Sequence, residues 1–207
     1  MSIVKLNNQG VKNATAFGSI TGLGSMIFIK KLTASSSATL SFVDGSNGVV
    51  LDDTYKEYVF TFKNIHPAND DQTIFQVNMS IDGGSNYNVT KTTTHFIAQH
   101  AESDAEASLE YRSAGDLAQS TSFQPLTVDI GGDADQSTSG YLQLFNPSST
   151  TFVKHFTSTM SAAQRSNYMV ESFVAGYGNT ISAVDAIQFK FETGNIDAGD
   201  ICLYGIA

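Results

Sequence analysis

The chain has 207 residues, which suits one domain or one domain with an appendage, and a core of this size needs no disulfide or metal. Its net charge of -9 argues against nucleic acid or an anionic membrane as partner, and no stretch approaches the ~18 apolar residues of a membrane span. Charged residues make up only 15% of the chain, and its 44 serine and threonine residues favour strands and turns over helices.

Residues 1–25 form the first predicted element, an N-terminal arm in which glycine and small polar residues surround irregularly spaced apolar ones. A wholly disordered tail would contain fewer apolar residues, and a secretory signal would contain a continuous apolar run. Two interpretations stay open: a strand that pairs with the domain's own sheet, or an arm that orders against a neighbouring subunit. We predict that the arm contacts a partner through its apolar residues, which are Ile3, Val4, Leu6, Val11, Phe17, Ile20 and Leu23.

Residues 26–207 form the predicted domain, in which apolar and polar residues repeatedly alternate. In residues 75–81 the odd positions are apolar and the even ones polar, and residues 38–42, 58–63 and 187–191 follow similar patterns. Each pattern predicts a strand with one face in the core and the other in water. The predicted strands are 26–32, 37–43, 57–64, 73–81, 87–97, 107–111, 125–130, 139–145, 151–158, 168–175, 184–192 and 200–206.

Turn residues separate these strands, notably the glycine-rich segments 44–48, 82–86 and 131–133. The prolines fall between apolar runs, and His66-Pro67 is interpreted as a turn. Residues 101–109 and 161–167 have a weakly helical composition, although the first also suits a polar loop that leads into a strand. We therefore expect an all-β fold with little helix: an antiparallel, jelly-roll-like β-sandwich preceded by the arm.

Cys202 is the only cysteine, so the chain cannot form an internal disulfide. We expect it to be a small buried apolar residue of the last strand rather than a reactive thiol.

The motifs of catalysis are missing from the sequence. No Gly-x-Ser-x-Gly nucleophile turn occurs, His66 lies in a predicted turn, and His155 lies on a predicted strand. Gly22-Leu23-Gly24 lacks the third glycine and the helix of a dinucleotide-binding turn. A carboxylate pair for glycoside cleavage stays open in principle. We predict no catalytic residue, no cofactor and no enzymatic activity.

Two acidic clusters have some features of metal sites. His100, Glu102 and Asp104 would share one face if extended and could then bind zinc, whereas His95 and His100 would point to opposite faces. The simpler interpretation is a solvated acidic loop. A second cluster could form a calcium loop from three aspartates, Asp129, Asp133 and Asp135. It lacks the spacing and the closing glutamate of a helix-loop-helix calcium site. Asp52-Asp53 and Asp70-Asp71 are poorer versions. Because turn-forming aspartates explain all three, we predict no metal.

Tyrosines offer the one indication of carbohydrate binding, since the chain has no tryptophan. A tyrosine ring can stack on a sugar, although cross-strand packing is the commoner use. The candidates are Tyr87, Tyr111, Tyr141, Tyr168 and Tyr177.

Five segments resemble a family of virion proteins from marine tailed bacteriophages. They are KKLTASSSATLSFVDG (30–45), NIHPA (64–68), GGSNYNVTKTT (83–93), LFNPSSTTFVKHF (144–156) and IQFKFETGNIDAGDICLYGI (187–206). The resemblance covers residues 26–206 and implies a β-sandwich displayed on a phage particle as a head decoration, tail component or fibre. It carries no functional residue over to this chain.

From this resemblance we expect a structural protein on the surface of the virion, either a head-decorating or cement protein or a fibre component, attached through its arm. The expected partners are other virion proteins, of the capsid or tail, and copies of the chain itself. The alternative is a carbohydrate-binding module for host-surface glycans, which is compatible with a place on the virion.

Overall fold

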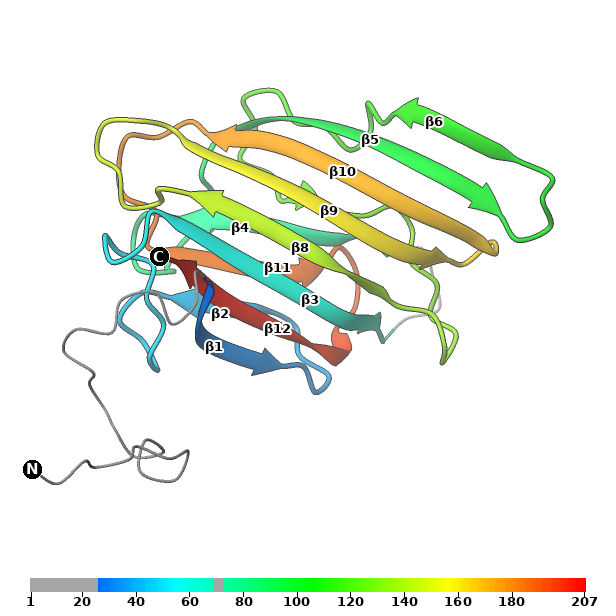
Figure 1. The fold of residues 1–207 in the computed structure, drawn as a ribbon, viewed down its shortest axis with the longest axis horizontal. Helices are drawn as coiled ribbons and strands as arrows, with labels where there is room; N and C mark the ends of the chain where they lie inside the picture. The colour runs from blue at the N-terminus through cyan, green and yellow to red at the C-terminus, as the bar shows by residue number, and fades with distance from the viewer. Residues whose placement is uncertain (1–25, 69–72) are drawn as a thin grey trace, which may run out of the picture.

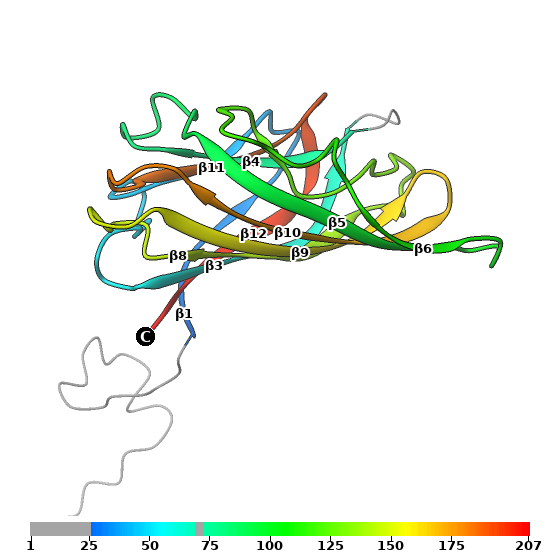
Figure 2. The ribbon, with the colours of Figure 1, turned by 90° about the horizontal axis from the view of Figure 1, so that it is seen from above.

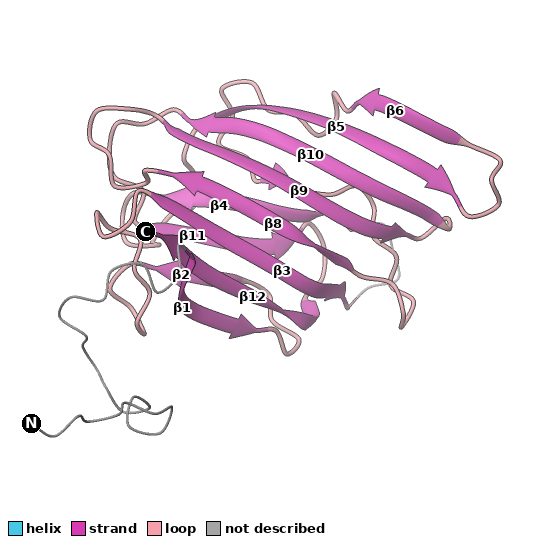
Figure 3. Ribbon diagram, in the orientation of Figure 1, coloured by secondary structure: helices cyan, strands magenta, loops and turns pink. Residues whose placement is uncertain are grey.

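A computed structural model describes residues 26–68 and 73–207, and these form two antiparallel sheets packed face to face (Figures 1 and 2). Strands are joined by loops and turns throughout the described residues, with no helix among them (Figure 3). The predicted all-β sandwich is therefore confirmed. Accordingly, the described part of the chain contains no helix long and apolar enough to cross a membrane.

The larger sheet has eight strands and lies in front of the smaller, four-stranded sheet in Figure 1. Its spatial order is β1 (Met26–Thr33), β12 (Ile196–Ile206), β3 (Glu57–Pro67), β8 (Thr138–Phe145), β9 (Lys154–Gln164), β10 (Tyr168–Gly178), β5 (Lys91–Ala101) and β6 (Ala107–Tyr111). The order in the smaller sheet is β2 (Leu40–Val43), β11 (Ala186–Phe191), β4 (Phe75–Ser80) and β7 (Gln124–Pro125). Both sheets combine strands that are distant in sequence.

Each predicted strand overlaps one of the observed strands, but neither weakly helical segment is a helix. Residues 161–164 extend β9, where Ala162 pairs with Val170 of β10. Residues 102–106 connect β5 to β6, and residues 107–109 belong to β6 itself. The ladder of the long β9–β10 hairpin overrides the local preference of its alanines.

The core lies between the two sheets and is rich in phenylalanine. The ring of Phe189 on β11 lies 5.4 Å from that of Phe60 and 5.1 Å from that of Phe62, both on β3. It also stacks on Phe75 of β4 at 5.9 Å. Phe189, Phe60 and Phe75 are fully buried, as the alternation of their strands predicts.

Strand β4 differs from prediction because both of its faces are buried, whereas its even positions were expected in water. The Asn78 side chain donates hydrogen bonds to the carbonyls of Tyr87 and Thr121, which belong to two separate loops. These loops cover the second face of β4. Ile81, predicted inward, lies beyond the strand and is 43% exposed.

Two further predictions are wrong. His66 and Pro67 do not form a turn but end β3, after an irregularity at Asn64, whose φ of 50° interrupts the ladder. Cys202 does lie on the last strand, but it points away from the core and is half-buried, because alternation turns Ile201 and Leu203 inward. The arm residues, Ile3 to Leu23, and Asp70-Asp71 lie outside the described residues.

Candidate binding face

The outer face of the eight-stranded sheet points away from the smaller sheet and the core (Figure 1). The strand register places residues from distant parts of the chain side by side across it. One row, read from β6 to β12, consists of Tyr111, Phe96, Phe173, Thr159, Tyr141, Thr61 and Cys202. This face therefore combines aromatic rings with hydroxyl groups, both of which suit the recognition of a neutral partner.

Apolar side chains concentrate where β10, β5 and β6 meet. The rings of Phe96 and Phe173 stack with their centroids 4.8 Å apart. Beside them, Leu109 is 72% exposed, Tyr111 55% and Met169 48%. Exposed apolar side chains that cluster in this way mark interaction surfaces more often than scattered ones do.

A shallow depression of about 310 Å³ lies next to this apolar region, over the start of β5 and β9 and the end of β10. Its rim carries the hydroxyls of Thr92, Thr94 and Thr157, and its other lining residues include Ala175. The rings of His155 and Tyr177 lie 6.0 Å apart along one side. Hydroxyls, an imidazole and an aromatic ring provide hydrogen bonds and one stacking surface, which is the chemistry that a sugar requires.

The structure brings three of the five candidate tyrosines, Tyr111, Tyr141 and Tyr177, to the outer face. Tyr168 points inward and packs beside the small apolar cluster of Ile97, Val128 and Val170. Tyr87 lies in the loop after β4, with its ring against Gly84. Tyr111 donates a hydrogen bond of 2.6 Å to the Asp116 carboxylate, and this bond raises the pKa of the Tyr111 hydroxyl.

The two acidic clusters do not converge. His100 contacts Asp104 at 3.0 Å, while His95 points into the protein from the other face of β5. Within residues 26–68 and 73–207, no three side chains of histidine, cysteine, aspartate or glutamate meet in a group that could hold a metal ion, and this applies to Asp129, Asp133 and Asp135 as well.

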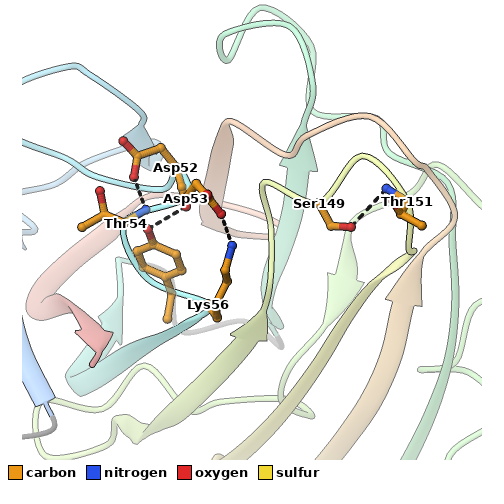
Figure 4. A network of polar contacts seen from close by, with 7 residues as sticks. Asp52, Asp53, Thr54, Lys56, Ser149 and Thr151 are labelled. Carbon is orange, nitrogen blue, oxygen red and sulfur yellow. Dashed lines mark hydrogen bonds and ion pairs between the residues drawn. The ribbon is translucent and has the colours of Figure 1, made fainter.

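Asp52 and Asp53 organise a turn at one end of the sandwich (Figure 4). The Asp52 carboxylate accepts the Thr54 N–H at 2.8 Å. Hydrogen bonds from the Thr54 side chain and then from this N–H lower the pKa of Asp52, while Asp53 forms an ion pair with Lys56. The neighbouring loop of Ser149 is tied to this one through the Asn146 N–H, which donates to the Lys56 carbonyl. These aspartates stabilise turns, as the simpler interpretation of the sequence proposed.

Sequence reasoning missed a layer of buried polar side chains on the inner face of β5. Lys91 is fully buried, and its ammonium donates to the Asn78 side chain at 2.5 Å and the Val89 carbonyl at 2.7 Å. Burial lowers the pKa of Lys91 to about 7. Further along the strand, Thr93 donates a hydrogen bond of 2.6 Å to the buried Gln124 side chain.

His95 belongs to the same layer and lines a cavity of about 50 Å³ together with Arg112, Thr127 and Asp129. Its side chain is 1% exposed, and neither ring nitrogen has a hydrogen-bond partner. Burial and the nearby Arg112 lower the pKa of His95 to about 4. One feature of the sequence indicated this burial. Lys91, Thr93 and His95 lie at two-residue spacing from the apolar Ile97, so on a strand they point to the same face as Ile97.

No family model, curated protein or solved structure matches this chain.

Proposed function

We propose that the chain is a structural protein on the surface of a bacteriophage particle, attached through its N-terminal arm. The observation that carries the proposal is the resemblance of five segments to phage virion proteins, and the places of these segments in the fold support a structural role. Residues 187–206 supply β11 and β12, which lie inside the two sheets. Residues 144–156 supply the β8–β9 connection, in which the buried Lys154 ammonium donates to the carbonyls of Phe152 and Thr180.

The place where the arm joins the domain also supports attachment through it. Strand β1 begins with Met26 at one edge of the larger sheet, paired with Ile206 near the end of the chain. Its first side chains, Met26, Ile27 and Phe28, are 47%, 40% and 57% exposed. Within residues 26–68 and 73–207, the buried members of the main core cluster lie between Ala34 and Leu203. We therefore expect the domain to fold when residues 1–25 are removed.

The test is to produce residues 26–207 and to replace Ile3, Val4 and Leu6 with serine in the full chain. Both proteins should stay folded, and both should fail to join phage particles that incorporate the unaltered chain. Replacement of the neighbouring polar residues Asn7 and Asn8 with serine is the matched control and should leave incorporation intact. Normal incorporation of the truncated chain would reject attachment through the arm.

A second candidate function, binding of a host-surface glycan, is favoured by the depression beside His155 and Tyr177. Its hydroxyls and rings offer the contacts that a neutral sugar would use, and a virion subunit can also bind a receptor.

Substitution Ala175→Tyr should fill this depression and abolish binding on a glycan array. Ala163→Tyr, on the same face but over the other end of β9, is the control that should retain binding. Equal binding by the two variants, or none by the unaltered chain, would reject a glycan site here.

A further inference from the structure

The edge strand β6 presents backbone groups that no other described strand uses. It is the last strand of the larger sheet, and the β5–β6 hairpin projects beyond the smaller sheet in Figure 2. The Arg112 N–H donates to the His95 carbonyl, and the Ala101 N–H donates to the Glu106 carbonyl. Because antiparallel pairing alternates, the backbone groups of Ala107, Leu109 and Tyr111 point away from β5 toward the open edge.

The other sheet edges carry features that hinder pairing. Strand β1 contains Lys30 and Lys31 and has a register irregularity between Phe28 and Lys30. In the smaller sheet, β7 has only two residues, and β2 has four. Strand β6 has five residues, contains no lysine or proline, and pairs with β5 in an unbroken register. Its one charged residue, Glu110, is paired with Arg112 at 2.8 Å, so β6 carries fewer of the features by which soluble proteins usually keep strand edges apart.

The sequence of β6 complements itself when two copies run antiparallel about Leu109. In that register Leu109 faces Leu109, and Ala107 faces Tyr111 of the second copy. Just beyond the strand ends, Glu106 is set opposite Arg112 of the second copy, and by symmetry the same juxtaposition recurs at the other end. Within one copy Arg112 pairs with Glu110 at 2.8 Å and Glu106 accepts a hydrogen bond from Tyr168, so the two charges across the contact add to these bonds or replace them. Opposite charges at facing positions favour pairing.

The neighbouring registers are unfavourable. Moving the two-fold axis by one residue toward the C-terminus sets Glu110 against Glu110, and moving it toward the N-terminus sets Glu106 against Glu110. Like charges in facing positions oppose pairing, so the register about Leu109 is selected. In this register Glu110 faces Ser108 of the second copy.

We propose that two copies of this chain associate through β6 as an antiparallel, two-fold symmetric pair centred on Leu109, which joins their larger sheets into one continuous sheet. The pairing covers the exposed Leu109 and Tyr111 side chains and gives partners to the outward backbone groups of β6. A two-fold pair occupies the β6 edge of both copies, so the pair is closed and does not add further copies through β6 to grow into a fibre. A contact between two five-residue strands buries less surface than a standard protein–protein interface, so we expect a weak dimer that forms at high concentration.

The first experiment is cysteine crosslinking of the full chain in a Cys202→Ser background. Facing residues of a hydrogen-bonded antiparallel pair have Cα atoms about 5.5 Å apart, within the range that a disulfide spans. Leu109→Cys should therefore give a disulfide-linked dimer on mild oxidation. Ser108→Cys is the matched control, because Ser108 faces Glu110 of the second copy and should crosslink much less. Equal crosslinking at the two positions, or none at position 109, would overturn the register.

The second experiment measures the dissociation constant by sedimentation. Leu109→Pro removes an N–H that points away from β5 and should weaken the dimer by about tenfold or more, which is about 1.4 kcal/mol. Glu106→Arg and Arg112→Glu should each weaken it, and the double variant should restore it. Asp53→Arg makes the same change of charge as Glu106→Arg, but in the loop before β3, and should have little effect on the dissociation constant. Circular dichroism checks that each variant is folded. A chain that stays monomeric at several hundred micromolar, or a dimer indifferent to these substitutions, would overturn the proposal.

Discussion

The buried His95 should make the protein sensitive to mild acid, and its replacement with leucine should remove much of that sensitivity. The His95 ring lies in a small cavity, and both of its nitrogens are unpaired. A Cβ on residue 115 would clash with the ring, so the glycine at this position leaves room for His95. Folding keeps the ring neutral, because burial and Arg112 lower the pKa of His95 from 6.5 to about 4.

The direction in which the free energy of unfolding changes with pH follows from the number of protons bound in the folded and unfolded states. Between pH 6.5 and about 4, the unfolded chain holds a proton on His95 that the folded chain does not, so the free energy of unfolding falls as the pH falls. At ~1.4 kcal/mol per pH unit, the loss from this residue between pH 7 and pH 4.5 is roughly 2 to 3 kcal/mol. Hydrogen bonds from Asn86 and Ser80 lower the pKa of Asp82 from 3.8 to about 2. The stability that the Asp82 carboxylate contributes is therefore lost only at lower pH.

Urea unfolding at pH 7 and pH 4.5 measures the effect. His95→Leu should reduce the difference in unfolding free energy between the two pH values by roughly 2 to 3 kcal/mol. It should also be tolerated at pH 7, because two unpaired buried nitrogens are removed. His155→Gln, at an exposed position on the outer face, is the control that should behave like the unaltered chain. An unchanged pH difference in His95→Leu would show that His95 is not the source of the acid sensitivity.

Three other predictions use the same unfolding assay. Lys91→Met should abolish a rise in stability between pH 7 and pH 9, because the folded chain releases the proton of Lys91 near pH 7 and the unfolded chain only near 10.5. Phe189→Ala should cost about 3–5 kcal/mol, since it removes the ring that joins the two sheets, and a much smaller loss would contradict this account of the core. Gly140→Ala should cost about 1–3 kcal/mol, because its Cβ would lie 2.2 Å from the Thr159 carbonyl oxygen, and an unchanged urea midpoint would show that the backbone yields freely.

Local patterns in the sequence were enough to predict the strands and most of the core. Alternation in residues 75–79 identified Phe75, Val77 and Met79 as inward, because that signal depends only on the pleat of one strand. The burial of Asn78 was missed because the loops that cover it come from residues 87 and 121, and no local pattern reports such coverage.

The outer face could not be predicted as a unit. Tyr111, Tyr141 and Tyr177 reach it from three separate strands, and which of their neighbours they meet depends on the strand order. That order is set by packing between distant segments. The burial of Lys91 and His95 was missed for a similar reason, because residues 112–124 cover the inner face of β5, as the bonds of Thr93 and Gln124 show. The role of the arm stays a prediction.

The most direct test of the proposed function is quantitative mass spectrometry of purified phage particles grown with the full chain or with residues 26–207 alone. The full chain should be recovered in the particles at a constant number of copies, and the truncated chain should stay in the unbound fraction as a folded protein. Recovery of the truncated chain in the particles at the same level would contradict attachment through the arm, and absence of the full chain from them would contradict the virion role itself.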